Sequence, residues 1–244
     1  MGIKKSSMRF VCAVFALCLG MMACNVLSNT TRVGDVNTDT QSVDLGSAST
    51  ARAQIEFAAG SLRVDGGADQ LMEATFRTNV PAWQAQVNYN VNGSQGDLMV
   101  KQPTDNKLPV GGEVINDWNI LLNNAVPLDL VINTAAGEIN LNLSDLDLST
   151  LQVDTAAGIT SLNLSGNWDH DVTAAITGGV GDLSITLPSE MGVRVNMDTA
   201  LVSVTTTGLE KDGDGYVNQA YGTAPNTLTL DLQTGIGSVK LMVP

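Results

Sequence analysis

The chain has 244 residues and a formal net charge of −13 at pH 7, with 25 acidic and 12 basic residues. This balance argues against a nucleic-acid partner, because neutralising phosphates requires clustered Lys and Arg. Only 15% of the residues are charged and 43% are hydrophobic, which excludes a disordered chain. The sequence therefore predicts a folded, acidic protein, and its length fits one large β domain or two small ones.

Residues 1–23 are predicted to be a secretory signal peptide. Lys4, Lys5 and Arg9 form a basic head, and residues 10–23 carry no charge. This uncharged stretch is shorter than the roughly 20 residues that a transmembrane helix needs. Removal of the segment after export is therefore favoured over a permanent membrane span.

Cys24 is the predicted site of lipid attachment. It follows Ala23 at the end of the apolar stretch, and this arrangement resembles the lipobox of bacterial lipoproteins, whose cysteine is acylated and becomes the mature N-terminus. Met21 stands where the lipobox usually has Leu, and ordinary signal cleavage nearby is the alternative. Lipidation would make the protein an extracytoplasmic, membrane-anchored lipoprotein of the cell envelope.

The mature chain is predicted to contain no disulfide bond. Cys12 and Cys18 lie inside the signal segment, so Cys24 would be the only cysteine left. Residues 24–50 are rich in Asn, Thr, Ser and Asp without sustained periodicity, and we interpret them as a flexible tether. Residues 51–244 would then form the folded domain.

From residue 51 onward, apolar and polar residues alternate with hardly any helical period, which predicts an all-β fold. A short phrase recurs six times: an apolar residue, two variable residues, two mostly small residues and a final Gly or, once, Val202. The copies are residues 55–60, 132–137, 153–158, 176–181, 197–202 and 232–237. From the second to the fifth copy the period is about 21 residues, and an insertion in residues 208–226 lengthens the last gap. This period predicts a β-helix or solenoid with one coil per copy.

Each coil is predicted to consist of a strand, a tight corner and a second strand. Residues 128–132 alternate before the second copy, and residues 138–141 alternate after its glycine. Small residues and Gly fit a corner at which the backbone turns sharply or stacks against the next coil. The functional alternative, a glycine-rich phosphate cradle, lacks the helix N-terminus or the Lys that it needs. Gly158 is accordingly expected to be stacked between Gly137 and Gly181.

Residues 71–127 are predicted to form an antiparallel element that caps or flanks the coils. Apolar residues from Trp83 to Val91 alternate with Gln and Asn, and Asn92-Gly93 is a typical hairpin turn. Such an element would protect the edge strand at an open end of the solenoid.

Several of these segments together resemble the toast-rack domain family of bacterial envelope proteins, which is similar to cell-wall-active antibiotic response proteins and to adhesin head domains. The resemblance covers roughly residues 51–244. It depends on residues 55–62, on Trp118-Asn119-Ile120 leading to residues 126–130, on the Ala-Ala-Gly corners, and on Tyr216-Val217-Asn218 with Tyr221 before the last strand. The resemblance implies a solenoid-like all-β fold and an envelope location, and it brings no catalytic residue.

His170 is the only histidine and lies between Asp169 and Asp171, so it could act as a general base or a metal ligand. Zinc binding and Ser-His-Asp catalysis would each depend entirely on this residue. It follows Gly166-Asn167, and a solvated loop is the favoured interpretation.

Residues 210–217 resemble the first part of an EF-hand calcium loop, with Asp212 and Asp214 at alternate positions and a Gly at the sixth. Tyr221 stands where that loop has a bidentate Glu, and the flanking residues have strand character. We favour a hairpin tip at residues 212–215, with weak calcium binding as the alternative.

An enzyme is a further possibility, because β-helix proteins also cleave polysaccharides with paired carboxylates or a basic residue. Asp145 and Asp147 share an expected strand face, and Asp129 and Asp154 could lie near them on neighbouring coils. In so acidic a chain, chance clustering on a solvated face is favoured over catalysis.

Trp83, Tyr89 and Trp118 could form a platform for a sugar. The alternation of the first two with Ala and Val favours packing in the core.

The sequence thus predicts a lipoprotein without catalytic, cofactor or metal site. It would display a β-solenoid as a scaffold or interaction module at the envelope, in adhesion or in the response to envelope stress. The expected partners are the membrane, through the N-terminal lipid, and an envelope protein or polysaccharide. The alternative function is a glycan-binding or glycan-cleaving β-helix.

Overall fold

The computed structural model describes residues 30–103 and 107–244. The predicted signal peptide and Cys24 therefore lie outside the described residues. The described chain contains fifteen β-strands and one short 3-10 helix, η1 (Pro81–Trp83). The predicted all-β class is confirmed. In this part of the chain, no helix has the length and apolar character needed to cross a bilayer.

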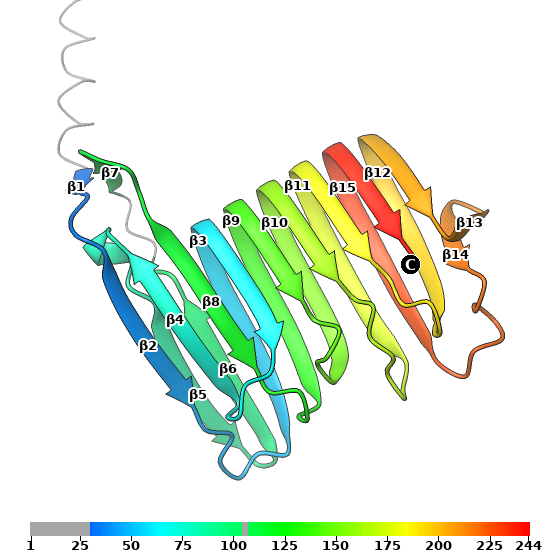
Figure 1. Ribbon diagram of the computed structural model, residues 1–244, viewed down its shortest axis with the longest axis horizontal. Coiled ribbons are helices and arrows are strands. Elements are labelled where there is room, and N and C mark those ends of the chain that lie inside the picture. Colours follow the sequence, from blue (N-terminus) through cyan, green and yellow to red (C-terminus); the bar gives the residue numbers. More distant parts are fainter. Residues whose placement is uncertain (1–29, 104–106) are drawn as a thin grey trace, which may run out of the picture.

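Six long strands form the body of the molecule, and each bends near its middle at one copy of the repeated phrase. Figure 1 shows them side by side with all the bends along one edge, which we call the corner. The strands are β3 (Thr50–Gly66), β9 (Leu128–Asn142), β10 (Leu148–Asn163), β11 (Val172–Thr186), β12 (Gly192–Thr207) and β15 (Thr227–Met242). Each bent strand is one coil, so the predicted order of strand, corner and strand is confirmed.

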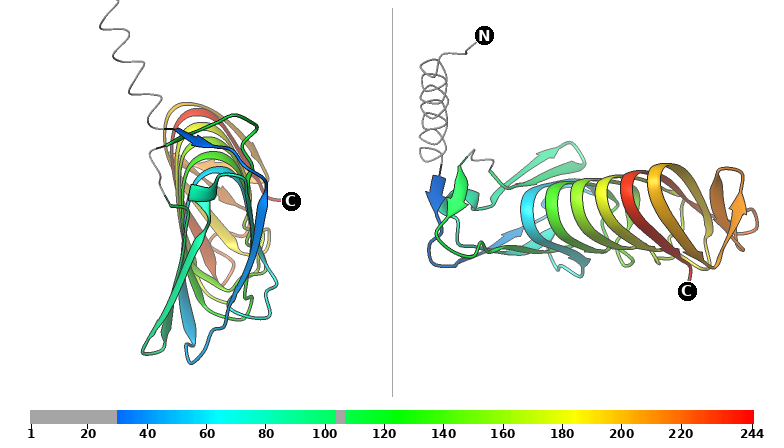
Figure 2. Two further views of the ribbon diagram at one scale, coloured as in Figure 1. Left: turned by 90° about the vertical axis from the view of Figure 1, so that its left-hand side faces the viewer. Right: turned by 90° about the horizontal axis from the view of Figure 1, so that it is seen from above.

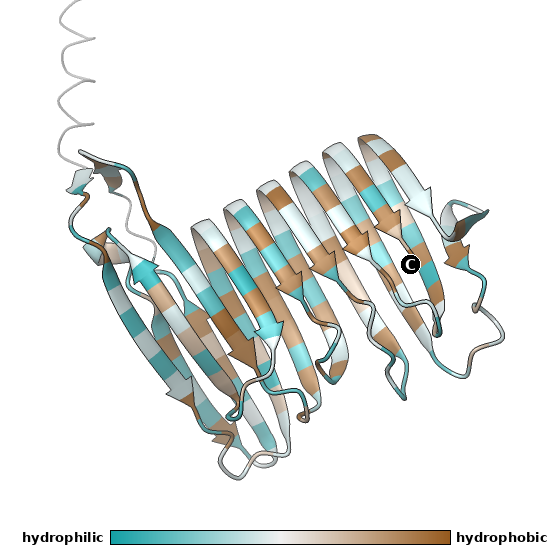
Figure 3. Cartoon of the chain, viewed as in Figure 1, coloured by the Kyte–Doolittle hydropathy of each residue, from teal (hydrophilic) through white to brown (hydrophobic). Residues whose placement is uncertain are grey.

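The two halves of each bent strand enclose the hydrophobic core between them, as the end-on view in Figure 2 shows. In β9, Leu128, Leu130 and Ile132 before the corner and Ile139 and Leu141 after it are at most 2% exposed. Hydrophobic and hydrophilic bands alternate along the coils in Figure 3. Because successive side chains of a strand point to opposite faces, this alternation directs one apolar row inward from each half.

The coils are parallel and in register, so that the corner glycines stack. Gly60, Gly137, Gly158, Gly181 and Gly237 are register partners along neighbouring strands. Their φ angles lie between 130° and 148°, a range that favours glycine. A Cβ at Gly158 would also collide with the carbonyl oxygen of Gly137. The predicted stacking of Gly158 between Gly137 and Gly181 is confirmed.

The order of the coils in space differs from their order along the chain. β15 pairs with β11 on one side and with β12 on the other, so the last strand of the chain lies between two earlier ones. Residues 208–226 make this possible, because they form the hairpin of β13 (Leu209–Asp212) and β14 (Gly215–Asn218) beyond β12 and then lead back.

The opposite end of the row divides into two flanking sheets. The first half of β3 pairs with β6 (Gln95–Lys101), which forms a hairpin with β5 (Gln86–Asn92). The second half of β3 pairs with β8 (Asn116–Leu122), followed by β4 (Met72–Thr78) and β2 (Asn37–Val43). The predicted antiparallel element at this end of the solenoid is therefore present.

The predicted tether at residues 24–50 needs correction from Thr30 onward. β1 (Thr30–Arg32) pairs with β7 (Leu108–Val110), and β2 pairs with β4 over its whole length. β2 is a largely exposed strand of mostly polar residues. It therefore lacks the apolar alternation by which a strand is recognised, and the folded part begins before residue 51.

Candidate functional site

An exposed apolar strip runs along the corner, and we call it the corner ridge. It consists of the residue before each corner glycine and its counterpart in β12, in register on adjacent strands: Ala59, Ala136, Ala157, Val180, Ile236 and Leu201. Val180 is 55%, Ile236 54% and Leu201 75% exposed. These three residues are consecutive in space at the strand spacing of about 4.8 Å.

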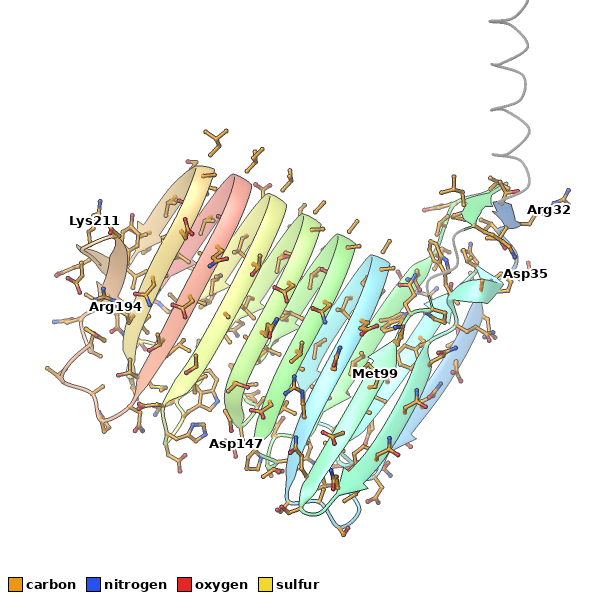
Figure 4. All side chains as sticks on the ribbon, turned by 180° about the vertical axis from the view of Figure 1, so that it is seen from behind. Arg32, Asp35, Met99, Asp147, Arg194 and Lys211 are labelled. Atoms are coloured by element: carbon orange, nitrogen blue, oxygen red, sulfur yellow. The ribbon has the colours of Figure 1, made fainter. Side chains whose placement is uncertain are left out.

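The corner ridge is uncharged along its whole length, and its side chains grow larger toward β12. Ile159, which follows Gly158, adds a further exposed side chain beside it. The nearest charged residues in the same strands are Glu138 and Asp182, which follow the glycines. Figure 4 shows side chains projecting outward from the bends. Contiguous apolar patches on the surface of a soluble protein can mark interaction sites.

The corner ridge does not follow from the repeated phrase, which indicates only small residues at the corner. Val180, Leu201 and Ile236 carry a signal, because they interrupt a position that is Ala in the other copies. Only the bend, which turns this position to the outside, shows that a larger residue here is exposed.

A groove of about 550 Å³ lies beside the corner ridge on the first halves of the coils, and we call it the corner groove. One residue per coil forms its polar side: Glu56, Asn133, Asp154 and Thr177, which are register partners. Ala58, Ala135 and Ala156 line it nearer the bend. The corner groove therefore offers one polar group per strand spacing.

The two carboxylates of the corner groove are held by neighbouring side chains. Glu56 lies 2.7 Å from Nζ of Lys101, and Asp154 accepts a hydrogen bond of 2.7 Å from Nε2 of Gln152. The strand that carries Asn133 separates them. The two acids are not register neighbours, so they do not form a carboxylate pair. The row of carboxylate, amide and hydroxyl groups suits recognition of a polar ligand instead.

Gln102 and Asn116 close the corner beside β3, where the row of glycines ends. Oε1 of Gln102 accepts hydrogen bonds from the backbone N of Ala58 (2.9 Å) and from Nδ2 of Asn116 (3.0 Å). Nδ2 of Asn116 also donates to the carbonyl oxygen of Ala59 (2.6 Å). Gln102 and Asn116 are each 2% exposed. Their hydrogen bonds to the backbone of Ala58 and Ala59 stand where the next coil would otherwise contact the corner of β3. No local sequence pattern links these two positions.

The structure does not bring the four candidate aspartates together. Asp145 and Asp147 lie in the connection between β9 and β10, which corrects the expected shared strand face. Asp129 is the register partner of Thr150 and accepts its hydroxyl (2.7 Å), whereas Asp154 is the partner of Asn133. Asp129 and Asp154 are therefore four positions apart along adjacent strands, too far for a carboxylate pair.

His170 lies in the connection after β10, as predicted, and bonds to the connection of the preceding coil. Its Nε2 is 2.9 Å from Oδ1 of Asp147, and its Nδ1 is 3.1 Å from the carbonyl oxygen of Asp171. The hydrogen bond to Asp147 raises the pKa of His170, because it favours the protonated ring. Asp147 is at the edge opposite the bends (Figure 4). The described residues contain no cluster of three or more metal-ligating His, Cys, Asp or Glu.

The candidate calcium loop is a hairpin tip, as the favoured interpretation predicted. Asp212 is paired with Gly215 across the turn, and Gly213 has a φ of 59°. The carboxylate of Asp212 bonds to the guanidinium of Arg194. Arg194 in turn lies 5.9 Å from the ring centroid of Tyr221. One of the two candidate calcium ligands is therefore already engaged.

The three candidate aromatic residues have different positions. Trp118 is 2% exposed and packs edge-on against Phe57 and Phe76, at centroid distances of 5.1 and 5.0 Å. Trp83 belongs to η1 and not to the expected strand, which begins at Gln86. Tyr89 donates a hydrogen bond of 2.7 Å to the carbonyl oxygen of Leu45, and burial raises the pKa of its phenol. Core packing is confirmed for Trp118, which leaves no face for a sugar.

Several solved structures match this chain over most of its length. A crystal structure of a candidate cell adhesion protein from Clostridium sporogenes is 26% identical, with a TM-score of 0.83, and the match covers 86% of this chain and 100% of that one. A candidate adhesin from Bacteroides fragilis is 11% identical with a TM-score of 0.37 over 86% and 99% of the chains. One from Parabacteroides distasonis is 10% identical with a TM-score of 0.27 over 87% and 99%. No curated protein matches.

The family comparison agrees with the bent-strand architecture. Residues 32–186, more than half of the chain, match the model of the N-terminal domain of toast_rack, DUF2154. The match begins in β1 and ends with β11, so it covers the flanking sheets and the first four coils in the row. This chain belongs to the toast-rack family.

Proposed function

We propose that the protein is a non-catalytic lipoprotein that displays its toast-rack domain at the cell envelope as an adhesive interaction module. The corner ridge carries this proposal. It is a continuous uncharged strip on an acidic protein, and Val180, Ile236 and Leu201 are each more than half exposed. Such a patch is typical of a protein-binding surface. The similarity to the candidate cell adhesion protein of Clostridium sporogenes supports an adhesive role.

The side-chain chemistry supports binding in preference to catalysis. The carboxylates of Glu56 and Asp154 are separated by a strand and held by neighbours. His170 bonds to Asp147 at the edge opposite the corner. Catalysis by an acid and base pair requires both groups at one reacting centre, and His170 with Asp147 lies at the edge opposite the corner groove that holds Glu56 and Asp154.

Lipidation at Cys24 would hold the domain close to the membrane. The described chain begins at Thr30, and six residues span at most roughly 20 Å when extended. Val180, Ile236 and Leu201 lie in the three coils at the end of the row away from β1 (Figure 1), so a partner bound there would meet the domain at the end remote from the anchor.

A crosslinking experiment on intact cells tests the proposed surface. A ridge variant combines Val180→Ser, Ile236→Ser and Leu201→Ser. The matched control combines Val36→Ser, Val91→Ser and Val110→Ser, which alters three exposed apolar residues (41–42%) outside the corner ridge. We expect the wild type and the control to capture the same envelope partner and the ridge variant to lose it. An unchanged capture by the ridge variant would contradict the proposal.

The corner groove supports a second candidate function, recognition of a linear glycan. Its polar row repeats once per coil, which suits a ligand that repeats along the same axis. A glycan array tests this function with the wild type and with Asn133→Ala combined with Asp154→Ala. A defined glycan that binds the wild type and not the variant would assign the corner groove. Binding of no glycan would leave the corner ridge as the proposed site.

A further inference from the structure

We propose that the protein forms a two-fold symmetric dimer in which the second half of β12 pairs with the same segment of a second copy. β12 ends the row of coils in space. On its outer side it pairs only with β14, at Arg194 and Val195. Among the described strands, none pairs with residues 196–207 on that side. Their backbone forms an open sheet edge.

The hairpin of β13 and β14 covers only the first half of this terminal coil. Val193 and Val195 in that half are 0% exposed, but Val204 in the second half is only partly buried. Its register partner one coil further in, Val239, is 2% exposed. The hydrophobic core is therefore incompletely covered at the open edge, where a second copy would complete it.

The open edge also lacks the features that usually prevent strands from pairing. Exposed edges are commonly protected by charged side chains, Pro, bulges or covering segments. Residues 199–207 contain no charge and no Pro or Gly, and they are rich in β-branched residues. From Leu201 to Thr207 the register with β15 is continuous. An edge of this kind is suited to pairing with another strand.

The edge can pair antiparallel with itself, which favours a second copy as the partner. The chain carries 25 acidic and 12 basic residues, so two copies repel each other across most orientations. The uncharged edge is a place where they can meet without opposing carboxylates. A two-fold axis through Val204 places Val202 opposite the partner's Thr206, with both side chains toward the core. This isologous arrangement closes at the dimer, because each edge is used once.

Two exposed positions of the edge test the pairing and its register. In the proposed dimer, Ser203 lies opposite the partner's Thr205. Thr205→Glu adds a negative charge to the edge, and its neighbour on β15 is Lys240, which can pair with it within the same subunit. The fold is therefore expected to tolerate this variant. Ser203→Lys adds the opposite charge at the facing position.

Sedimentation equilibrium of the purified full-length chain in mild detergent provides the measurement, with circular dichroism to verify folding. We expect a wild-type dimer and at least a tenfold higher dissociation constant for Thr205→Glu and for Ser203→Lys. An equimolar mixture of the two variants should restore dimers, because Lys then faces Glu across the axis. The control is Thr173→Glu on β11, a strand paired on both sides, and it should dimerise like the wild type.

Four results would overturn the proposal. They are a monomeric wild type at its highest soluble concentration, unchanged dimerisation of both edge variants, no recovery in the mixture, or species that grow beyond the dimer with concentration. The last result would indicate head-to-tail stacking of coils. Because the assay uses purified protein alone, these results are independent of whether the corner ridge captures an envelope partner.

Discussion

Val202 occupies in β12 the position that Gly237 occupies in the adjacent strand β15. Gly237 has a φ of 143°. Every described residue with a positive φ is a glycine, so the φ angle of Val202 is negative and its backbone conformation differs from that of Gly237. The difference has a steric consequence. In the conformation of Gly237, a Cβ would meet the carbonyl oxygen of Gly181 on the neighbouring strand toward β3. β12 has the same kind of neighbour in β15, so Val202 is accommodated by its different backbone conformation. The requirement for glycine is therefore a property of the corners with positive φ.

Gly158→Val tests this requirement inside the stack. We expect it to lower the free energy of unfolding by about 1–3 kcal/mol, because the side chain would combine backbone strain with a collision against the carbonyl oxygen of Gly137. Denaturant unfolding provides the measurement. Val202→Gly is the control and should cost less than about 1 kcal/mol. Equal midpoints for Gly158→Val and wild type would refute stacked corners.

Gly178→Ala should have the opposite effect on stability. Gly178 does not have a positive φ, and it lies between Thr155 and Thr234 in register, beside a small pocket of about 20 Å³. A Cβ would lie 3.2 Å from Cγ2 of Thr234, which requires only a small shift. We expect a gain of up to about 1 kcal/mol, mainly because alanine restricts the unfolded chain. A loss as large as that of Gly158→Val would contradict this explanation.

His170 should make stability depend on pH. The hydrogen bond to Asp147 raises the pKa of His170 above 6.5 in the folded state. Its contribution is therefore complete below the unfolded pKa of about 6.5 and is lost as the pH rises through the folded value. The side chain is 36% exposed, so we expect less than about 1 kcal/mol.

Unfolding of the wild type and of His170→Gln, at about pH 5 and about pH 9, measures this contribution. The wild type should exceed the variant by more at the lower pH. A ring pKa at or below 6.5 by NMR titration would show that the bond to Asp147 is not maintained in solution.

The hairpin tip should respond to calcium no more than its uncharged variant does. Asp212 is bonded to Arg194, and Tyr221 replaces the bidentate acid. We expect calcium to change the stability of the wild type and of Asp212→Asn combined with Asp214→Asn alike, within about 0.5 kcal/mol. A true site of about 1 mM affinity would instead add roughly 1.4 kcal/mol at 10 mM calcium. Such a gain, lost in the double variant, would establish a metal site.

Cys24→Ser tests the proposed lipid anchor. If Cys24 is acylated, the variant should leave the membrane fraction or stall before signal cleavage, and it should no longer incorporate labelled fatty acid. Cell fractionation and metabolic labelling measure both outcomes. Wild-type fractionation and processing of the variant would exclude lipidation at this residue.

The sequence predicted the coil and its corner because both depend on local patterns. Alternation around Gly137 and Gly158 indicated strands, and the repeated glycines indicated the bends. β2 was not recognised because it is a polar, exposed strand. The ridge was not recognised either, because the exposure of Leu201 depends on the direction in which the bend turns it.

The order of coils could not be predicted because it depends on long-range pairing. The copy that contains Gly237 has the same corner glycine as the copies around Gly158 and Gly181, so its sequence specifies a coil and not a position in the row. Its position is determined by pairing with both β11 and β12, two strands that precede it in the chain. The closure by Gln102 and Asn116 is likewise a contact between distant segments.

The position of β15 makes attachment of β12 depend on a segment that follows it in the chain. β12 has its long inner edge paired only by residues 227–242. A chain that ends before β15 would leave β11 and β12 each with an open edge, and exposed edges of this kind promote aggregation. A chain truncated before Thr227 therefore lacks the strand that joins β12 and its hairpin to the other coils.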